Sequence, residues 1–176
     1  MTVAIILLNY NGLNDTLECL DSVYKIDYPD FKVVVIDNGS KIKPKAQILK
    51  KFPQTTVIEN DENLGFAEGC NIGISYAMQK KYPYILLLNN DTVVDKNLLK
   101  NFVATALAQK TGGIFGAKIL SYTQKNKIDN IGSFFSWKTG QFVQYGSGFG
   151  QDLPQFNQQK KVDYVCGGGF FIKSEV

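Results

Sequence analysis

The stretch LLLNNDTVV, residues 86–94, changes from aliphatic side chains to two amides and a carboxylate within one step along the chain. The apolar run that ends here, 84–88, has the length of a strand, and a run that is apolar at successive positions is typical of a strand buried on both faces. Asn89, Asn90 and Asp91 would then lie where this strand leaves its sheet. Taken alone, the tripeptide is more typical of an Asx turn than of a ligand site.

Similar apolar runs alternate with segments of helical periodicity through the first two thirds of the chain. The predicted strands are 3–8, 31–37, 55–59 and 84–88, and the predicted helices are 14–26, 43–52, 65–80 and 96–110. Asp15 and Glu18 predict a capping box at the start of the first helix. This order of elements predicts an α/β fold with a mostly parallel central sheet that is flanked by helices on both faces.

The character of the sequence changes beyond about residue 112, where glycine and aromatic residues become frequent. Alternating segments predict a small mixed or antiparallel β portion in this last third, at 113–120, 133–137, 140–146 and 163–173. The segment GSGFG, 146–150, has no aliphatic strand before it and is expected to be a loop. No linker rich in Pro, Gly or Ser divides the chain, so we expect a single domain over residues 1–176.

Composition excludes several kinds of chemistry. The chain contains no histidine, which excludes Ser-His and Cys-His nucleophilic catalysis and leaves acid-base work to carboxylates, lysine or tyrosine. It contains no arginine either, so a phosphate group would have to be bound by a metal, by lysine or by backbone N–H groups. Cys19, Cys70 and Cys166 form no C-x-x-C pair, which argues against a zinc site and a disulfide framework.

The charge and hydropathy of the chain indicate where it works. A net charge of +3 is too small and too scattered to predict nucleic-acid binding. No segment approaches the ~20 apolar residues of a membrane span. We therefore expect a soluble chain, with a weak attraction to anionic substrates or lipid headgroups left open. The three cysteines, which suggest no disulfide framework, favour a reducing, cytoplasmic compartment.

Polar residues follow three of the four predicted strands, in the segments 9–11, 37–40 and 89–91. Ligands of parallel sheets gather at the carboxyl ends of the strands, so these segments predict a convergent polar site. Asp91, with amide oxygens beside it, is a candidate ligand of Mg²⁺. Asp37 could accept an N–H from the edge of a pyrimidine, and Tyr10 offers a ring on which the base could pack.

Two groups of glycines each allow two interpretations. Glycines 65, 69 and 73 follow one face of the third predicted helix, where they either permit close packing or bring the helix amino end near Gly65 to a phosphate. The glycines of CGGGFF, 166–171, either form a β-bulge or allow something to approach the backbone closely. The sequence does not separate the alternatives in either case.

Five segments in this order resemble the family 2 glycosyltransferases, and among them the rhamnosyltransferase-like members: VAIILLNYNG with LECLDSV, VVVIDNGS, ENLGFAEGCNIGI, YILLLNNDTVV and GGGFFIKSEV. The resemblance implies the GT-A fold, with a Rossmann-like sheet. It also implies inverting transfer of a sugar from a UDP- or dTDP-linked donor to a glycan or lipid-linked saccharide acceptor, assisted by Mg²⁺ or Mn²⁺. The family's D-x-D-like motif corresponds to residues 89–91, with Asp91 as metal ligand and Asn90 near the ribose, although Asn89 replaces the first aspartate.

Further site residues are expected in both halves of the chain. Residues 1–111 would form the nucleotide-binding half, and 112–176 the start of the acceptor-side half. The expected nucleotide contacts are Asn9, Tyr10, Asn11, Asp37, Asn63, Gly65, Asn71 and Asn90, and the expected donor-sugar pocket contains Asn89, Gly168 and Gly169.

The resemblance leaves the catalytic base and two alternative functions open. The family's general base lies in an acidic segment shortly after GGGFFIKSEV, so the base is expected beyond Val176. One alternative is therefore a fragment that binds a nucleotide-sugar without turnover. The other is a sugar nucleotidyltransferase, which would need a glycine-rich, arginine-bearing loop that the segment 9–15 lacks. Nucleic-acid partners are not expected. Peripheral association with the inner face of the membrane is left open.

Overall fold

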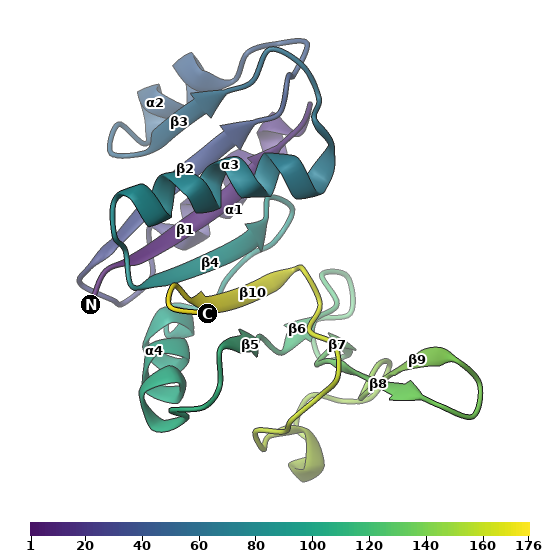
Figure 1. Cartoon of the computed structure of the whole chain (residues 1–176). Helices are drawn as coiled ribbons and strands as arrows, with labels where there is room; N and C mark the ends of the chain where they lie inside the picture. The colour runs from purple at the N-terminus through teal and green to yellow at the C-terminus, as the bar shows by residue number, and fades with distance from the viewer.

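The computed structural model describes residues 1–176 and places four parallel strands at the centre of the molecule (Figure 1). These strands are β1 (Val3–Asn9), β2 (Phe31–Asp37), β3 (Thr56–Glu59) and β4 (Tyr84–Asn89). The sheet is completed by β10 (Gly169–Lys173), antiparallel to β4, and by β5 (Ile114–Gly116), giving the order β3-β2-β1-β4-β10-β5. The predicted α/β class with a mostly parallel sheet is confirmed.

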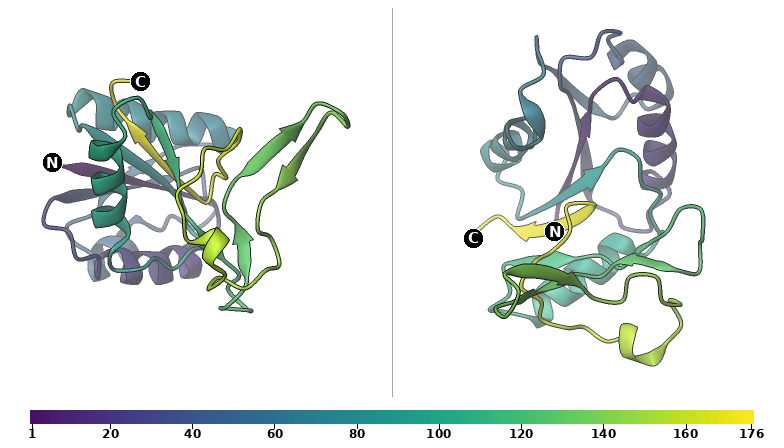
Figure 2. Two further views of the ribbon diagram at one scale, coloured as in Figure 1. Left: turned by 90° about the horizontal axis from the view of Figure 1, so that it is seen from below. Right: turned by 90° about the vertical axis from the view of Figure 1, so that its right-hand side faces the viewer.

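Four helices cover the two faces of this sheet, as the views in Figure 2 show. They are α1 (Leu13–Val23), α2 (Lys45–Lys51), α3 (Gly65–Gln79) and α4 (Leu98–Ala108). Successive side chains of β1 point to opposite faces of the sheet and so divide the core into two clusters. Val3, Ile5 and Leu7 pack with residues of α1, α2 and α4. Ala4 and Ile6 belong to the second core cluster, on the side of α3. Both faces are therefore buried, which explains the unbroken apolar run.

The predicted capping box at the first helix is wrong. Asn11 has a positive φ of 56°, so the chain turns immediately after β1 and the helix begins at Leu13. Its N-cap is Gly12, which makes no side-chain capping hydrogen bond. Asp15 therefore lies inside the first turn and Glu18 farther along the helix, and neither side chain makes a capping hydrogen bond.

Helix α3 packs closely on the sheet through two of its glycines. A Cβ at Gly69 would lie 2.5 Å from Cδ1 of Leu8, and one at Gly73 would overlap Cγ2 of Ile6. Close packing is therefore the reason for glycine at these two positions. Gly65 differs from them, because its φ is +81° and a Cβ added there would meet no atom within 4 Å.

We expect Gly73→Ala to lower the free energy of unfolding by about 1–2 kcal/mol. Overpacking against the buried Ile6 costs ~1–3 kcal/mol, and the higher helix propensity of alanine offsets at most ~1 kcal/mol of it. The matched control is Ser75→Ala, at an exposed position of the same helix, which should be neutral or slightly stabilising. Urea unfolding of both variants checks the prediction, and equal midpoints would contradict it.

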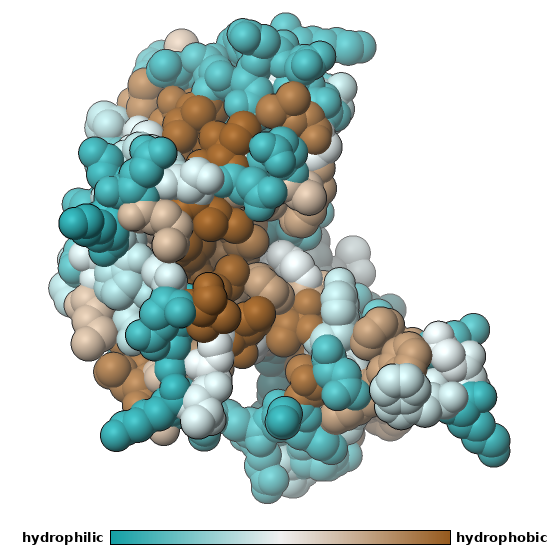
Figure 3. Space-filling view, in the orientation of Figure 1, coloured by the Kyte–Doolittle hydropathy of each residue, from teal (hydrophilic) through white to brown (hydrophobic).

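The last third of the chain forms two small antiparallel sheets, as predicted. One pairs β6 (Ile119–Leu120) with β7 (Ile128–Asn130), and the other pairs β8 (Ser133–Ser136) with β9 (Gln141–Gln144). A 3₁₀ helix, η1, covers Pro154–Phe156. The β8–β9 hairpin stands out from the body as an arm with hydrophobic and hydrophilic residues on its surface (Figure 3). Residues 146–150 form a loop with positive φ at Gly146 and Gly148, as expected.

The strand predicted at 163–173 begins only at Gly169, where pairing with Leu88 near the carboxyl end of β4 starts. The pairing of β10 with β4 is regular, so the glycines form no β-bulge. A Cβ at Gly168 would lie 2.9 Å from Cδ1 of Ile119, and one at Gly169 would lie 3.1 Å from Cβ of Ala117. The close approach expected here is thus made by the chain itself. No helix is both long and apolar enough to cross a lipid bilayer.

Candidate functional site

The three polar strand ends meet at one edge of the sheet. Asn9 at the end of β1 is paired with Asp37 at the end of β2, and on the other side of β1 Leu8 is paired with Asn89 of β4. The strand order changes direction at β1, since β2 and β3 lie on one side of it and β4 on the other. Such a position is where open α/β sheets bind ligands.

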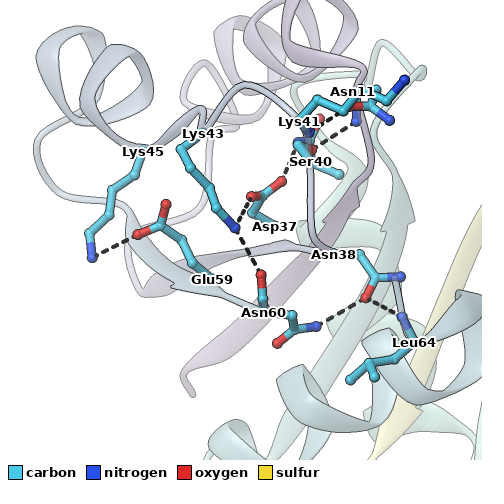
Figure 4. A network of polar contacts seen from close by, with 11 residues as sticks. Asn11, Asp37, Asn38, Ser40, Lys41, Lys43, Lys45, Glu59, Asn60 and Leu64 are labelled. Carbon is cyan, nitrogen blue, oxygen red and sulfur yellow. Dashed lines mark hydrogen bonds and ion pairs between the residues drawn. The ribbon is translucent and has the colours of Figure 1, made fainter. Parts of the chain in front are cut away.

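Asp37 is a buried carboxylate with one free oxygen. The residue has no exposed surface, and its Oδ1 accepts a hydrogen bond of 2.9 Å from Nδ2 of Asn9. Its Oδ2 has no hydrogen-bond partner, although Nζ of Lys43 lies 3.6 Å away (Figure 4). The Lys43 ammonium donates instead to the carbonyl oxygen of Asn60 at 2.9 Å. Because a buried acceptor without a partner is costly and rare, this oxygen is a candidate for binding a donor from a ligand.

Tyr10 and Asn11 form the loop that follows β1, directly beside Asp37. The side chain of Tyr10 is 48% exposed, so the ring is available for stacking. Asn11 ties this loop to the one after β2, because its backbone N–H donates to Oγ of Ser40 at 2.8 Å. Its Oδ1 accepts from the backbone N–H of Lys41 at 2.9 Å. These bonds hold the two loops at a fixed distance.

Asn38 organises the approach to helix α3. Its Nδ2 donates to Oδ1 of Asn63 at 2.8 Å and to the carbonyl oxygen of Gly65 at 3.0 Å. Its Oδ1 accepts from Nδ2 of Asn60 and from the backbone N–H of Leu64 (Figure 4). Asn63, an expected nucleotide contact, thus holds the start of α3, where its Oδ1 also accepts from the N–H of Gly65.

The remaining expected contact residues, Asn71, Gly168 and Gly169, lie outside the network around Asp37 and Asn38. Asn71 is exposed on α3, and its Nδ2 lies 3.4 Å from Oε2 of Glu68 in the first turn of that helix. Gly169 is buried where β10 begins, paired with the residue before Asn89, so the expected donor-sugar residues lie at adjacent strand ends. Gly168 precedes that strand and is partly buried.

A hydrogen-bonded chain of buried and partly buried side chains joins the end of β2 to the end of β4 through α1. Oγ1 of Thr16 donates to Oδ1 of Asn9 at 3.0 Å. The same oxygen accepts from Nδ2 of Asn90, also at 3.0 Å. Sequence reasoning missed Thr16, which has no exposed surface. The available signal was a polar residue on the apolar stripe of the helix, four residues before the fully buried Leu20.

Asp91 lies in the turn after β4 and is exposed. It borders a cavity of about 280 Å³ whose lining residues are Asp15, Glu18, Asp91, Thr92, Val93 and Tyr122. The Tyr122 hydroxyl donates to Oε1 of Glu18 at 2.7 Å, and this hydrogen bond, together with the charge of Glu18, raises the pKa of Tyr122.

The residues present fit a metal held by few protein ligands. No group of three or more carboxylate or thiol side chains is arranged to hold a metal ion. Mg²⁺, however, typically takes one or two protein carboxylates and completes its shell with substrate phosphates and water. An exposed Asp91 at the edge of the sheet can serve as such a single ligand.

The thiol of Cys19 lies beneath this turn, 3.7 Å from the carbonyl oxygen of Asn89. Burial raises the pKa of Cys19 from its ordinary value of 9.0 to about 11, and the charges of Asp91 and Glu18 act in the same direction. The hydrogen bonds with Thr92 oppose this change. Cys19 is therefore a neutral thiol near pH 7 rather than a nucleophile.

We expect the raised pKa of Cys19 to make the fold sensitive to alkali. The unfolded chain ionises this thiol near pH 9 and the folded chain only near pH 11, so the stabilisation is present below pH 9 and is lost as the pH rises toward 11. The loss amounts to at most about 3 kcal/mol. Urea unfolding between pH 8 and pH 11 should show a steeper decline for the parent chain than for Cys19→Ala, and parallel declines would contradict the prediction.

The chain matches the family described as Glycosyl transferase family 2 over residues 4–176. It is 29% identical over 96 residues to the poly-beta-1,6-N-acetyl-D-glucosamine synthase of Staphylococcus epidermidis, a match that covers 53% of this chain and 22% of that protein. It is 23% identical over 143 residues to the glycosyltransferase GlyG of Streptococcus pneumoniae serotype 4, covering 79% and 44%. The chain thus spans less than half the length of these curated relatives.

Two solved structures resemble this fold with a TM-score of 0.59 and 25% identity. One is TarS 1–349 of S. aureus, which has been solved in complex with UDP-GlcNAc, and in that complex the match covers 68% of this chain and 34% of that one. The other is the mannosyltransferase PcManGT of Pyrobaculum calidifontis in complex with GDP-Man and Mn²⁺, where the match covers 68% of this chain and 35% of that one.

Proposed function

The chain belongs to glycosyl transferase family 2 and has the GT-A fold, and from this premise we propose that it binds a nucleoside-diphosphate sugar at the carboxyl ends of β1, β2 and β4. The sugar is transferred to a glycan or lipid-linked saccharide acceptor. The observation that carries the proposal is the buried Oδ2 of Asp37, which has no hydrogen bond. The exposed Tyr10 directly follows Asn9, the residue with which Asp37 is paired in the sheet. The complexes of similar proteins with UDP-GlcNAc and GDP-Man support it.

Asp37 and Tyr10 suit the recognition of a uracil or thymine base. The N3–H of either base is a donor that can meet the free carboxylate oxygen, while the ring packs on Tyr10. The side chain of Lys43 is 48% exposed and covers this oxygen, so it can move aside into solvent when the base arrives. We therefore propose UDP- or dTDP-linked donors, with dTDP-rhamnose among those to be tested because of the resemblance to rhamnosyltransferases.

A divalent cation, Mg²⁺ or Mn²⁺, fits beside Asp91. When bound there, such an ion stabilises the negative charge that develops on the pyrophosphate leaving group. The chain has no arginine to share this charge, so lysine and backbone N–H groups are the other available partners. The complex of PcManGT with Mn²⁺ supports the assignment.

Inverting transfer requires a carboxylate that deprotonates the acceptor hydroxyl on the opposite face of the sugar. We propose that residues 1–111 form the nucleotide-binding half and that 112–176 begin the acceptor side. In support, the polar strand ends and the Asn38 network all lie in the first half, and Tyr122 reaches the site from the second. An acceptor on a lipid carrier would place the reaction at a membrane surface.

Calorimetric titration with UDP, dTDP and GDP, each with and without Mn²⁺, tests the proposal. We expect UDP or dTDP to bind, more tightly with Mn²⁺ than in EDTA. Failure of every nucleotide to bind would overturn it. Incubation with labelled donors then separates transfer from binding without turnover, and formation of a nucleotide-sugar from a nucleoside triphosphate and a sugar 1-phosphate would indicate a nucleotidyltransferase instead.

A further inference from the structure

In the hydrogen-bonded chain from Asp37 to Asn90, chemistry decides which group donates and which accepts at each step. An ionised carboxylate only accepts hydrogen bonds, so Asn9 must turn its Nδ2 toward Asp37, as the 2.9 Å contact records. The carbonyl end of the same amide, Oδ1, then faces Thr16 and can only accept. The charge of Asp37 therefore fixes the orientation of a side chain on the neighbouring strand.

Thr16 in turn orients the amide of Asn90, which follows β4. Its hydroxyl has a single proton, which is directed at Oδ1 of Asn9 or at the carbonyl oxygen of Gly12, both 3.0 Å away and both pure acceptors. The hydroxyl oxygen keeps its lone pairs for Asn90, whose Nδ2 donates to it at 3.0 Å. Because Nδ2 of Asn90 faces Thr16, the carbonyl oxygen of that amide is turned the other way.

The packing around Asn90 holds this arrangement. The side chain is partly buried, and its Nδ2 also lies 3.4 Å from the carbonyl oxygen of Gly12. A Cβ at Gly12 would come within 2.9 Å of that Nδ2. Glycine at this position, at an ordinary φ of −112°, is therefore what allows the amide to reach Thr16.

We propose that Thr16 is a positioning residue that turns the carbonyl oxygen of Asn90 toward the donor nucleotide, where it accepts a hydrogen bond from a ribose hydroxyl. The inference rests on the proposed function, and it assigns a role to Thr16, a buried helix residue that touches no ligand. The base end and the ribose end of the site are thereby set by one network that runs from Asp37 to Asn90.

Deoxyribose analogues test the proposal directly. We expect the parent chain to bind UDP about fivefold to tenfold more tightly than 2′-deoxy-UDP or 3′-deoxy-UDP, which is the ordinary effect of one neutral hydrogen bond. The Thr16→Val variant should bind UDP no more tightly than the deoxy analogue that the parent chain discriminates against. Thr16→Ser keeps the hydroxyl and should restore the difference, a rescue that a purely structural role in packing would not give.

Two further variants keep the test independent of folding. Gly12→Ala retains the hydroxyl of Thr16 but displaces the amide of Asn90, so it should also lose the discrimination. Ser22→Ala removes another buried hydroxyl from α1, one that donates to the carbonyl oxygen of Cys19, and should leave the discrimination unchanged.

The outcomes separate the inference from the function on which it rests. Discrimination that persists in Thr16→Val, or in Gly12→Ala should the valine variant not fold, would overturn the role of Thr16. A parent chain that binds UDP and both analogues alike would also overturn it, while leaving the proposed function in place. A parent chain that binds no nucleotide removes both.

Discussion

Asp37→Asn should reverse the base preference of the chain while leaving its fold intact. The amide has the shape of the carboxylate, and its oxygen can still accept from Asn9, but an N–H now occupies the position of the free Oδ2. That N–H opposes the N3–H of uracil and matches N3 of cytosine, which is an acceptor. We expect UDP to bind about tenfold to a hundredfold more weakly, as for loss of a hydrogen bond to a charged group, and CDP to bind more tightly than in the parent chain.

Titrations of UDP and CDP against the parent chain, Asp37→Asn and Asp37→Ala measure this effect. The alanine variant should weaken UDP with or without Mn²⁺ and should not favour CDP. Removal of the carboxylate leaves no buried charge behind, because its partner Lys43 is half exposed, so both variants should fold. A ratio of UDP to CDP affinity that stays the same in Asp37→Asn would show that Asp37 does not contact the base.

Asp91→Ala should remove the effect of the metal without altering binding in its absence. Asp91 is exposed in a turn, so its loss should not disturb the core. We expect UDP affinity in Mn²⁺ to fall by about tenfold, to the value in EDTA, and any sugar transfer to fall about a hundredfold or more, because charge on the leaving pyrophosphate is no longer stabilised.

Matched variants make this second result specific. Asp152→Ala removes an exposed carboxylate far along the chain and should keep the full response to Mn²⁺. Asp15→Asn removes the charge of another residue that lines the same cavity, and an equal loss there would indicate that both carboxylates hold the ion. An unchanged Mn²⁺ response in Asp91→Ala would count against Asp91 as the ligand.

Local patterns explain why most of the sheet and its helices could be predicted. The run at 84–88 is apolar at every position because β4 is covered on both faces, and this property is visible in the residues themselves. The ends of elements were less predictable. The chain turns at Asn11, through a positive φ that asparagine tolerates but does not require, and this turn moves the start of α1 and invalidates the capping box.

Pairing over long separations could not be predicted from such patterns. The strand predicted at 163–173 starts six residues before β10, because the start of β10 depends on its pairing with β4, about eighty residues earlier along the chain. The roles of the glycines depend equally on their neighbours. Gly69 and Gly73 face Leu8 and Ile6 across the interface of helix and sheet, which neither helix periodicity nor glycine spacing specifies.

The sequence by itself determined the class of fold, the family and the edge of the sheet where polar residues gather, because hydropathy period and strand-end composition are local properties. Only the tertiary structure decided how those residues act together. It buries Asp37 with one free oxygen, joins Asn9 to Thr16 and brings Asn90 to the same hydroxyl. These contacts follow from the parallel order of β2, β1 and β4, which sets side chains from distant segments within hydrogen-bond range.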